Sequence, residues 1–182
     1  MRGMPSFVLP AAVLAWALAL SNGGAAESME YRVKAACLYK LLSFVEWPPE
    51  TLGEPSKPLV IGVLGEDPFG ALLDQTVRDR VVGGRKVEVR RFGDVEAAKA
   101  AHIVFVNLKG ETLTAALKAL EGVPVLTVGE SSAFVDGGGV VRFVIRDEKV
   151  AFEINPDAGR KAKLAISAQL LKISKIVGRK GD

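Results

Sequence analysis

The side chains best suited to chemistry are few and lie far apart in the 182-residue chain. The chain holds one histidine, His102, and one cysteine, Cys37. His102 could act as a general base, but it opens an apolar run, which favours a structural histidine with one ring nitrogen satisfied. Cys37 falls on an apolar helical stripe, so a small buried hydrophobic side chain is the preferred interpretation, with an intermolecular disulfide as the alternative.

Acidic and hydroxyl side chains occur mainly as neighbouring pairs. Glu66-Asp67 and Asp147-Glu148 fall in expected turns, where solvated charge explains them. Ser131-Ser132 lacks the G-x-S-x-G setting of a nucleophilic serine. One histidine, one cysteine and scattered carboxylates also give no usual spacing for metal ligands. We therefore expect no enzymatic activity, no metal and no cofactor.

The glycines after the first expected strand resemble a nucleotide-binding loop only in spacing. Gly65 and Gly70 are as far apart as the two P-loop glycines, but Ala71-Leu72 stand where Lys and Ser/Thr are needed. Gly62-Val-Leu-Gly65 lacks the G-x-G of a dinucleotide fingerprint. A turn in which Asp67 caps the next helix explains these residues better.

The first 26 residues have the pattern of a cleavable signal peptide. Arg2 gives a positive start, Phe7–Leu20 is an uncharged apolar run, and Ser21–Ala26 supplies small residues for cleavage after Ala26. The run is shorter than the roughly 20 apolar residues of a membrane-spanning helix, which makes a retained anchor the alternative. We expect residues 1–26 to be removed and residues 27–182 to form one exported, periplasmic domain.

Charge excludes one class of partner. The chain carries 24 basic and 21 acidic residues, a formal net charge of +3, which is too weak to indicate nucleic-acid binding. Basic residues gather at the end of the chain, at Lys172, Lys175, Arg179 and Lys180. We expect them in and beyond the last turns of a closing helix, where cations are favourable.

Apolar runs alternate with amphipathic segments through the middle of the chain. The expected strands are Pro58–Leu64, Lys86–Phe92, His102–Val106 and Val123–Val128, and the expected helices between them are Asp67–Arg80, Val95–Ala100 and Glu111–Leu120. Glu111–Leu120 is expected to be capped by Gly110. Such alternation predicts a parallel sheet with right-handed crossovers.

The two ends depart from this alternation. A first helix is expected over Glu30–Val45, with Val33, Cys37, Leu41 and Phe44 as its apolar stripe. Near the other end, Val140–Ile145 and Val150–Ile154 should form an antiparallel hairpin. Asn155 should then cap one long helix that reaches Val177. The fold class is therefore α/β, a mainly parallel sheet with an antiparallel C-terminal hairpin, flanked by N- and C-terminal helices.

Short motifs along the whole chain resemble one family. They are Tyr31–Ala36 with Phe44-Val-Glu-Trp-Pro48, Gly62–Gly65 with Asp67–Gly70, Gly84-Arg85 with Val89–Phe92, His102–Phe105, Pro124–Val128, Phe152-Glu-Ile-Asn155 with Ala158-Gly159, Leu164–Ser167, and Leu170–Lys172. In this order they resemble the YfiR family over nearly all of the mature chain. The family's cysteine pairs are absent, and Ala101 stands where members often carry a cysteine before the His-Ile run.

The resemblance implies a function that the residues alone do not. The best-known members are periplasmic and non-enzymatic, and they hold an inner-membrane diguanylate cyclase inactive by binding its periplasmic region. An outer-membrane lipoprotein releases the block by sequestering the repressor. A protein of this kind would modulate cyclic-di-GMP, and with it biofilm formation and motility. Family membership leaves open whether the partner is a cyclase or another membrane sensor, and whether the protein forms a homodimer.

A small-ligand-binding module is the alternative function. Its site would lie at the carboxyl ends of the parallel strands, on the rim formed by Gly65–Pro68, Asn107–Gly110 and Gly129–Phe134. An apolar pocket of roughly 300 Å³ or more there would favour it, whereas an exposed apolar patch on the terminal helices or hairpin would favour a protein partner. Phe69 and Phe134 near this rim are core residues first and aromatic anchors second. The candidate partner-binding residues are Phe134, Glu153, Asn155, Gln169 and Lys172.

Overall fold

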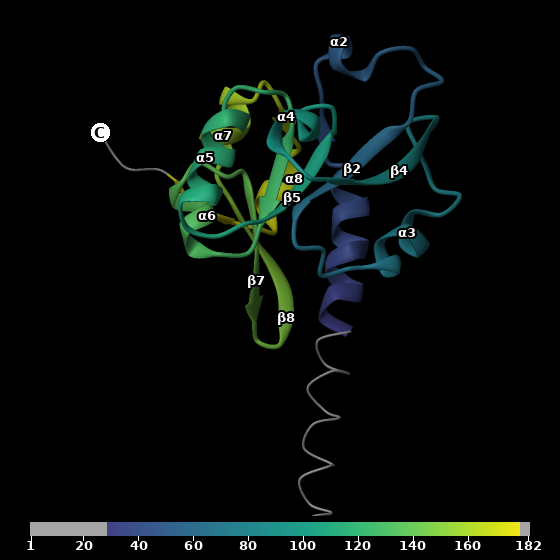
Figure 1. The fold of residues 1–182 in the computed structure, drawn as a ribbon. Helices are drawn as coiled ribbons and strands as arrows, with labels where there is room; N and C mark the ends of the chain where they lie inside the picture. The colour runs from purple at the N-terminus through teal and green to yellow at the C-terminus, as the bar shows by residue number, and fades with distance from the viewer. Residues whose placement is uncertain (1–28, 179–182) are drawn as a thin grey trace, which may run out of the picture.

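The computed structural model describes residues 29–178 (Figure 1). The helices are a first helix described over 29–41, α2 Pro49–Leu52, α3 Ala71–Val77, α4 Val95–Ala98, α5 Gly110–Leu120, α6 Ser132–Asp136, α7 Pro156–Lys161 and α8 Ala168–Lys172. The strands are β1 Val45–Glu46, β2 Leu59–Gly65, β3 Val81–Val82, β4 Arg85–Phe92, β5 Ile103–Asn107, β6 Leu126–Gly129, β7 Val141–Arg146, β8 Lys149–Ile154, β9 Ala165–Ile166 and β10 Lys175–Ile176.

An eight-stranded sheet in the order β10-β8-β7-β6-β5-β2-β4-β3 forms the centre of the molecule. Strands β4, β2, β5, β6 and β7 run parallel to one another. The β7–β8 hairpin and the β3–β4 pair are antiparallel. Strands β1 and β9 make a separate antiparallel pair. The mainly parallel sheet and its C-terminal hairpin are thus confirmed.

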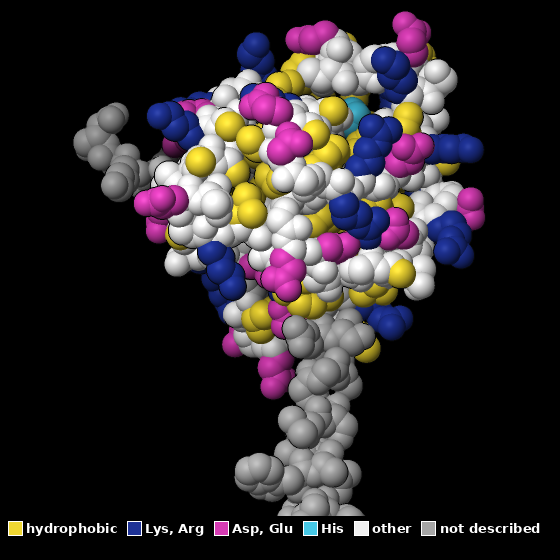
Figure 2. Space-filling view, viewed as in Figure 1, with side chains coloured by type: hydrophobic (Ala, Val, Ile, Leu, Met, Phe, Trp, Pro, Cys, Tyr) yellow, Lys and Arg dark blue, Asp and Glu magenta, His cyan; other side chains and the backbone are white. Residues whose placement is uncertain are grey.

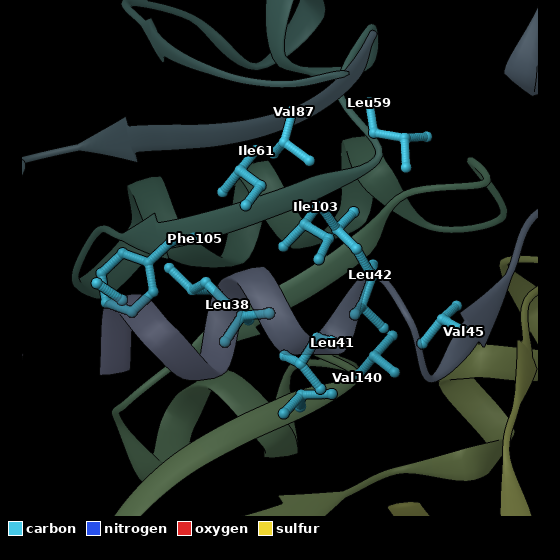
Figure 3. Close-up of a cluster of buried hydrophobic side chains, with 14 of the residues drawn as sticks. Leu38, Leu41, Leu42, Val45, Leu59, Ile61, Val87, Ile103, Phe105 and Val140 are labelled. Atoms are coloured by element: carbon cyan, nitrogen blue, oxygen red, sulfur yellow. The ribbon is translucent and has the colours of Figure 1, made fainter. Parts of the chain in front are cut away.

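Both faces of the central strands are buried, which is why their sequences are continuous apolar runs. In β2, Ile61 and Val63 contribute to one apolar cluster, and Val60 and Leu64 contribute to the other. The first helix and α3 cover one face, and α4, α5 and α6 cover the opposite face. Figure 3 shows the first cluster, where Leu38, Leu41 and Leu42 of the N-terminal segment meet β2 and β5. The sheet is therefore the middle layer of three.

The first helix is shorter than its apolar stripe predicted. It ends at residue 41, and Val45 lies in β1 rather than in the helix. Pairing of Val45 with Ile166 and of Glu46 with Ala165 draws this segment into an extended conformation. The helix also buries a different face, because Ala35 and Leu38 are 0 % exposed whereas Val33 is 42 % exposed.

The turn after β2 has a different geometry from the predicted helix cap. Asp67 Oδ1 accepts hydrogen bonds from the Phe69 N–H (2.8 Å) and the Gly70 N–H (3.2 Å). These bonds close a local Asx-type turn, and α3 starts only after Gly70, whose φ is 51°. Likewise, Lys109 rather than Gly110 occupies the cap position of α5.

The single long closing helix was a wrong prediction. Asn155 does cap a helix, because its Oδ1 accepts from the Asp157 N–H (3.1 Å) and the Ala158 N–H (3.0 Å). That helix, α7, ends near Lys163, whose φ of 57° is incompatible with helix continuation. Ser167 then caps α8, because its Oγ accepts a hydrogen bond from the Leu170 N–H (3.2 Å). The basic residue Lys175 lies in β10 rather than in a helix.

Residues 1–26, the predicted signal peptide, lie outside the described residues, so their removal stays a prediction. Within residues 29–178, no helix combines the length and the apolar character needed to cross a membrane.

Candidate functional site

An apolar groove lies between the first helix and the elements β8 and α8. Its volume is about 430 Å³, and it is lined by Arg32, Val33, Ala36, Cys37, Lys40, Leu41, Phe44, Phe152, Leu170 and Ile173. We call these residues the apolar groove. Two of its aliphatic side chains are strongly exposed, Val33 at 42 % and Ile173 at 66 %. Exposed apolar surface of this kind on terminal elements is typical of a binding site.

The groove explains the predicted helical stripe. Val33, Cys37, Leu41 and Phe44 do share one side, but that side forms a groove wall as well as contacting the core. Phe152 from β8 and Leu170 and Ile173 from the α8 region form the other wall. The sequence analysis placed Ile173 on a closing helix and did not identify it or Phe152 as surface residues, because the break of that helix carries no proline or glycine at its centre.

Cys37 is a wall of this groove and is only partly buried. Burial raises the pKa of its thiol, so the reactive thiolate is disfavoured at neutral pH. Cys37 therefore contributes apolar surface to the groove. Its proposed pairing with another chain stays untested.

Basic side chains flank the apolar groove. Arg32 and Lys40 are exposed on the first helix and line the groove, while Lys172 is exposed beside it on α8. The wider surface carries charges of both signs mixed with apolar side chains, as the face in Figure 2 shows. The groove edge is thus locally basic on a surface that is otherwise mixed.

A buried ionic cluster fixes the other side of the first helix. Lys34 is 4 % exposed and pairs with Glu30 and with Glu130, whose Oε1 lies 2.5 Å from Lys34 Nζ. Tyr31 donates its hydroxyl to Glu130 Oε2 at 3.2 Å. Burial lowers the pKa of Lys34, but the hydrogen bonds to the two carboxylates outweigh it and raise the pKa overall. Because Glu130 follows β6 directly, these contacts hold one groove wall against the sheet.

At the carboxyl-end rim, the crevice between β2 and β5 is closed. The helices that follow these two strands, α3 and α5, lie on opposite faces of the sheet. In open α/β sheets, the crevice between two such strands is the usual position of a ligand. Here Asn107 Nδ2 donates to the Glu66 carbonyl at 2.9 Å and ties the two loops together. A Cβ on Gly65 would lie 2.3 Å from the Asn107 carbonyl oxygen, so the loops are in direct contact.

A second cavity opens beside this closed crevice. It has a volume of about 670 Å³ and is lined by Leu64, Gly65, Phe92, Gly93, Asp94, Val95, Leu108, Thr112, Ala115, Ala116 and Ala119. We call it the rim cavity. It is mostly apolar and lies at the carboxyl ends of β2, β4 and β5, on the face covered by α4 and α5. Phe69, in contrast, is 5 % exposed and packs edge-on against Tyr31 and Phe105, so it belongs to the core.

The structure separates the five predicted partner-binding residues. Gln169 and Lys172 are exposed on α8, next to the groove residue Leu170. Phe134 is 1 % exposed, with its ring against the backbone of Gly129 and Gly139, so its position is a packing position. Asn155 caps α7. The set therefore does not form one surface, and whether any of these residues contacts a partner stays a prediction.

Glu153 differs from its expected position on the outside of an alternating strand, because its side chain is 5 % exposed. It pairs with Arg142 through Oε2, and Lys175 Nζ lies 3.3 Å from its Oε1. Burial raises the pKa of Glu153, but hydrogen bonds from Arg142 and Lys175 outweigh it, so the pKa lies below its ordinary value. Neighbouring cations thus explain how a carboxylate is tolerated there.

Within residues 29–178, no group of three or more histidine, cysteine or carboxylate side chains could hold a metal ion. The polar clusters instead tie elements together, and the apolar groove and the rim cavity are two of the hollows on the surface. The fold defines the protein as an α/β domain with a mostly parallel central sheet.

The sequence profile of the YfiR/HmsC-like family matches residues 31–175, and the chain belongs to this family. Members of the family are known as regulators of diguanylate cyclase signalling, and the family is a regulatory rather than an enzymatic one. The suspected family resemblance is thereby confirmed. No curated protein matches the chain.

Two solved structures are similar at low identity. The ABC domain in complex with L-Trp from Streptococcus pneumonia is 13% identical, with a TM-score of 0.51, and the match covers 79% of this chain and 60% of that one. A conserved domain protein from Vibrio cholerae O1 biovar eltor is also 13% identical, with a TM-score of 0.46 and coverage of 65% and 54%. The chain thus spans only 60% of the length of the first structure, and the likeness to it is one of fold alone.

Proposed function

We propose that this protein is a non-enzymatic periplasmic regulator that binds the periplasmic region of an inner-membrane diguanylate cyclase and holds the cyclase inactive. Family membership supports the signalling context. The observation that carries the binding role is the apolar groove, where Val33 on the first helix and Ile173 at the end of α8 remain exposed. Another membrane sensor as the partner, and capture by an outer-membrane lipoprotein, are variants of the same proposal.

Repression of this kind is an equilibrium between two states of the partner. A regulator shifts that equilibrium only by the difference between its affinities for the inactive and the active state. The first helix is held by the Lys34 cluster, so the groove is pre-formed and little ordering free energy is lost on binding. An amphipathic partner helix would place apolar side chains in the groove and acidic ones near Arg32 and Lys40.

The test measures cellular cyclic-di-GMP after deletion of the gene and after its restoration. We expect the level to rise on deletion and to return only when the exported form is supplied. A form without residues 1–26, which stays in the cytoplasm, is the matched control. An unchanged level after deletion would contradict cyclase repression.

The rim cavity favours a second candidate function, binding of a small apolar ligand. Its volume of about 670 Å³ at the carboxyl ends of the strands meets the size expected of such a site. Ala115→Phe would place a ring in the cavity from the exposed side of α5. Toluene should raise the melting temperature of the wild-type protein and not that of the variant, and an equal response of both proteins would contradict a ligand site there.

A further inference from the structure

A short pair of strands joins the two walls of the apolar groove. The wall made by the first helix continues through the groove residue Phe44 into β1. The other wall begins at Ser167, which directly follows β9 and caps α8. Strands β1 and β9 pair over two residues each, and the Ser167 N–H donates to the Phe44 carbonyl at 2.9 Å. We call residues 44–46 and 165–167 the β1–β9 junction, and it connects the groove walls directly.

Trp47 links this junction to the histidine of the chain. It directly follows β1, is 7 % exposed, and donates from Nε1 to the backbone carbonyl of His102 at 3.2 Å. The two rings also pack edge to face, with their centroids 5.8 Å apart. A movement of the imidazole therefore displaces Trp47 and, with it, β1.

The surroundings of the imidazole do not accommodate a second ring proton. Nδ1 accepts from the Val60 N–H at 3.0 Å, so the neutral ring carries its proton on Nε2, which is buried and has no hydrogen-bond partner within residues 29–178. A proton on Nδ1 would face the Val60 N–H, and both ring N–H groups would be buried without an acceptor. The charged group that acts on the ring is Arg85 from β4, which opposes a further positive charge. The contacts from β2 and from Trp47 do not titrate. Protonation thus requires the ring to leave its position.

We propose that His102 makes the β1–β9 junction pH-sensitive: when the ring takes up a proton from solvent it leaves its position, Trp47 is released, the junction opens and the groove walls separate. The neutral ring keeps the junction closed and the groove intact. The consequence, release of a bound partner in acid, rests on the proposed function of the groove, whereas opening of the junction does not. Loss of the proton restores the closed form, so the step is reversible.

Proton linkage gives the sign of the effect. In the open form the exposed ring has the ordinary pKa of 6.5, whereas in the closed form burial, aided by Arg85, lowers the pKa of His102. The open form therefore binds the proton more tightly, and its population increases as the pH falls below 6.5, by up to about tenfold for each pH unit. The increase ends where the closed form is protonated as well.

Hydrogen exchange of the exported protein, followed by nuclear magnetic resonance and corrected for intrinsic exchange rates, tests the proposal. The amides of Val60 and Ser167 and the indole N–H of Trp47 report on the junction. The amide of Leu117 in α5, on the opposite face of the sheet, reports on global unfolding. We expect the first three groups to share one opening constant, roughly tenfold or more above that of Leu117, as a local opening requires. It should increase about threefold or more from about pH 7.5 to about pH 5.5.

His102→Gln removes the titrating group and should hold the opening constant within about twofold over the same pH range. If this variant does not fold, the wild-type protein alone decides. An opening constant of Ser167 that equals that of Leu117 would mean global unfolding and would overturn the proposal. So would an opening constant of Ser167 that does not change with pH, whether or not that of Val60 does. Because the assay contains no partner, its failure would leave cyclase repression to be judged by the cyclic-di-GMP measurement.

Discussion

Single side chains hold the long loops of this protein, and Arg85 does so most directly. Its Nη1 donates to the carbonyls of Leu52 (2.9 Å), Glu54 (2.6 Å) and Lys57 (3.1 Å), and its Nη2 donates to the Gly53 carbonyl (3.1 Å). The loop between α2 and β2 thus closes around one guanidinium. The planar fork of arginine supplies several fixed donors at once, which a lysine ammonium cannot reproduce.

We predict that Arg85→Lys lowers the free energy of unfolding by about 1–2 kcal/mol, because several carbonyl bonds are lost together. Urea denaturation measures this change. Arg90→Lys is the matched control, because Arg90 is exposed and, among the residues that the structure describes, pairs with Glu88 alone, at 3.2 Å. Its effect should stay below about 0.5 kcal/mol. Equal effects of the two substitutions would contradict the role of Arg85.

His102 is a structural histidine, as its position at the start of an apolar run predicted. Its Nδ1 accepts from the Val60 N–H at 3.0 Å, and Nε2 is buried and has no hydrogen-bond partner within residues 29–178. Burial, aided by Arg85, lowers the pKa of His102 below its ordinary value of 6.5. Protonation of Nδ1 would also break its bond to Val60, so the folded protein favours the neutral ring.

The pH dependence of stability follows from this lowered pKa. Well above pH 6.5 both the folded and the unfolded chain hold a neutral His102, so its contribution is constant. Below that value the unfolded chain takes up a proton more readily, and stability falls as pH drops towards the folded-state pKa. We predict this loss in urea denaturation as the pH falls below the ordinary histidine value of 6.5. His102 is the only histidine, so His102→Gln should flatten the slope, and an unchanged slope would contradict the assignment.

At the scale of elements, the β7–β8 hairpin carries backbone strain at its tip. Asp147 and Glu148 have φ values of 50° and 59°, in the left-handed region. Two-residue hairpin turns prefer this conformation because it matches the strand twist, but they usually place Asn or Gly there. The antiparallel register from Arg146↔Lys149 to Val141↔Ile154 forces it on these two acidic residues.

We predict that Glu148→Gly raises the free energy of unfolding by about 0.5–1 kcal/mol, because glycine adopts a positive φ without steric cost. Thermal denaturation should show a higher melting temperature. The neighbouring Lys149→Gly is the control, since Lys149 lies in the strand β8. This substitution should lower the free energy of unfolding by a similar amount, because glycine is unfavourable in a strand. A lower melting temperature for Glu148→Gly would contradict the relief of strain.

The first helix and α8 together provide the proposed interface, so a charge placed on either should disturb it. We predict that Val33→Glu and Ile173→Glu each weaken binding of the periplasmic region of the partner by tenfold or more, because a carboxylate would be desolvated in an apolar groove. Isothermal titration calorimetry measures the affinity. Circular dichroism should show an unchanged fold, since both side chains are largely exposed in the free protein.

Val81→Glu is the matched control for these two variants. Val81 is an aliphatic side chain 55 % exposed on β3, at the opposite edge of the sheet from β8. Its substitution should leave affinity within twofold. Undiminished binding by both groove variants would exclude the groove as the interface, and an equal loss with Val81→Glu would indicate an effect of net charge.

At the scale of the whole molecule, the apolar groove and the rim cavity lie apart on the sheet. The apolar groove lies on the side of β8 that carries Phe152. The rim cavity lies farther along the sheet, at the carboxyl ends of β2, β4 and β5. A partner and a small solute could therefore occupy the protein at the same time.

Local pattern alone predicted the elements whose signal is short-range. Buried parallel strands such as β5 are continuous apolar runs because both of their faces pack, and the β7–β8 hairpin follows from two apolar segments joined by a short polar turn. Capping by Asn155 was equally predictable, since its side-chain oxygen accepts hydrogen bonds from backbone N–H groups two and three residues later. These are interactions between near neighbours in sequence.

Contacts between residues far apart in the sequence determined the remaining features, and these contacts are visible only in the tertiary structure. The segment after Asn155 has a helical apolar period, yet β1 pairs with β9 and β8 pairs with β10, and these contacts divide it into short pieces. The stripe through Val33 and Phe44 has the same sequence pattern whether it is covered or open, and only the placement of Phe152 and Ile173 opposite it leaves a groove. Periodicity records which side of an element is apolar, whereas the rest of the fold determines how much of that side is buried.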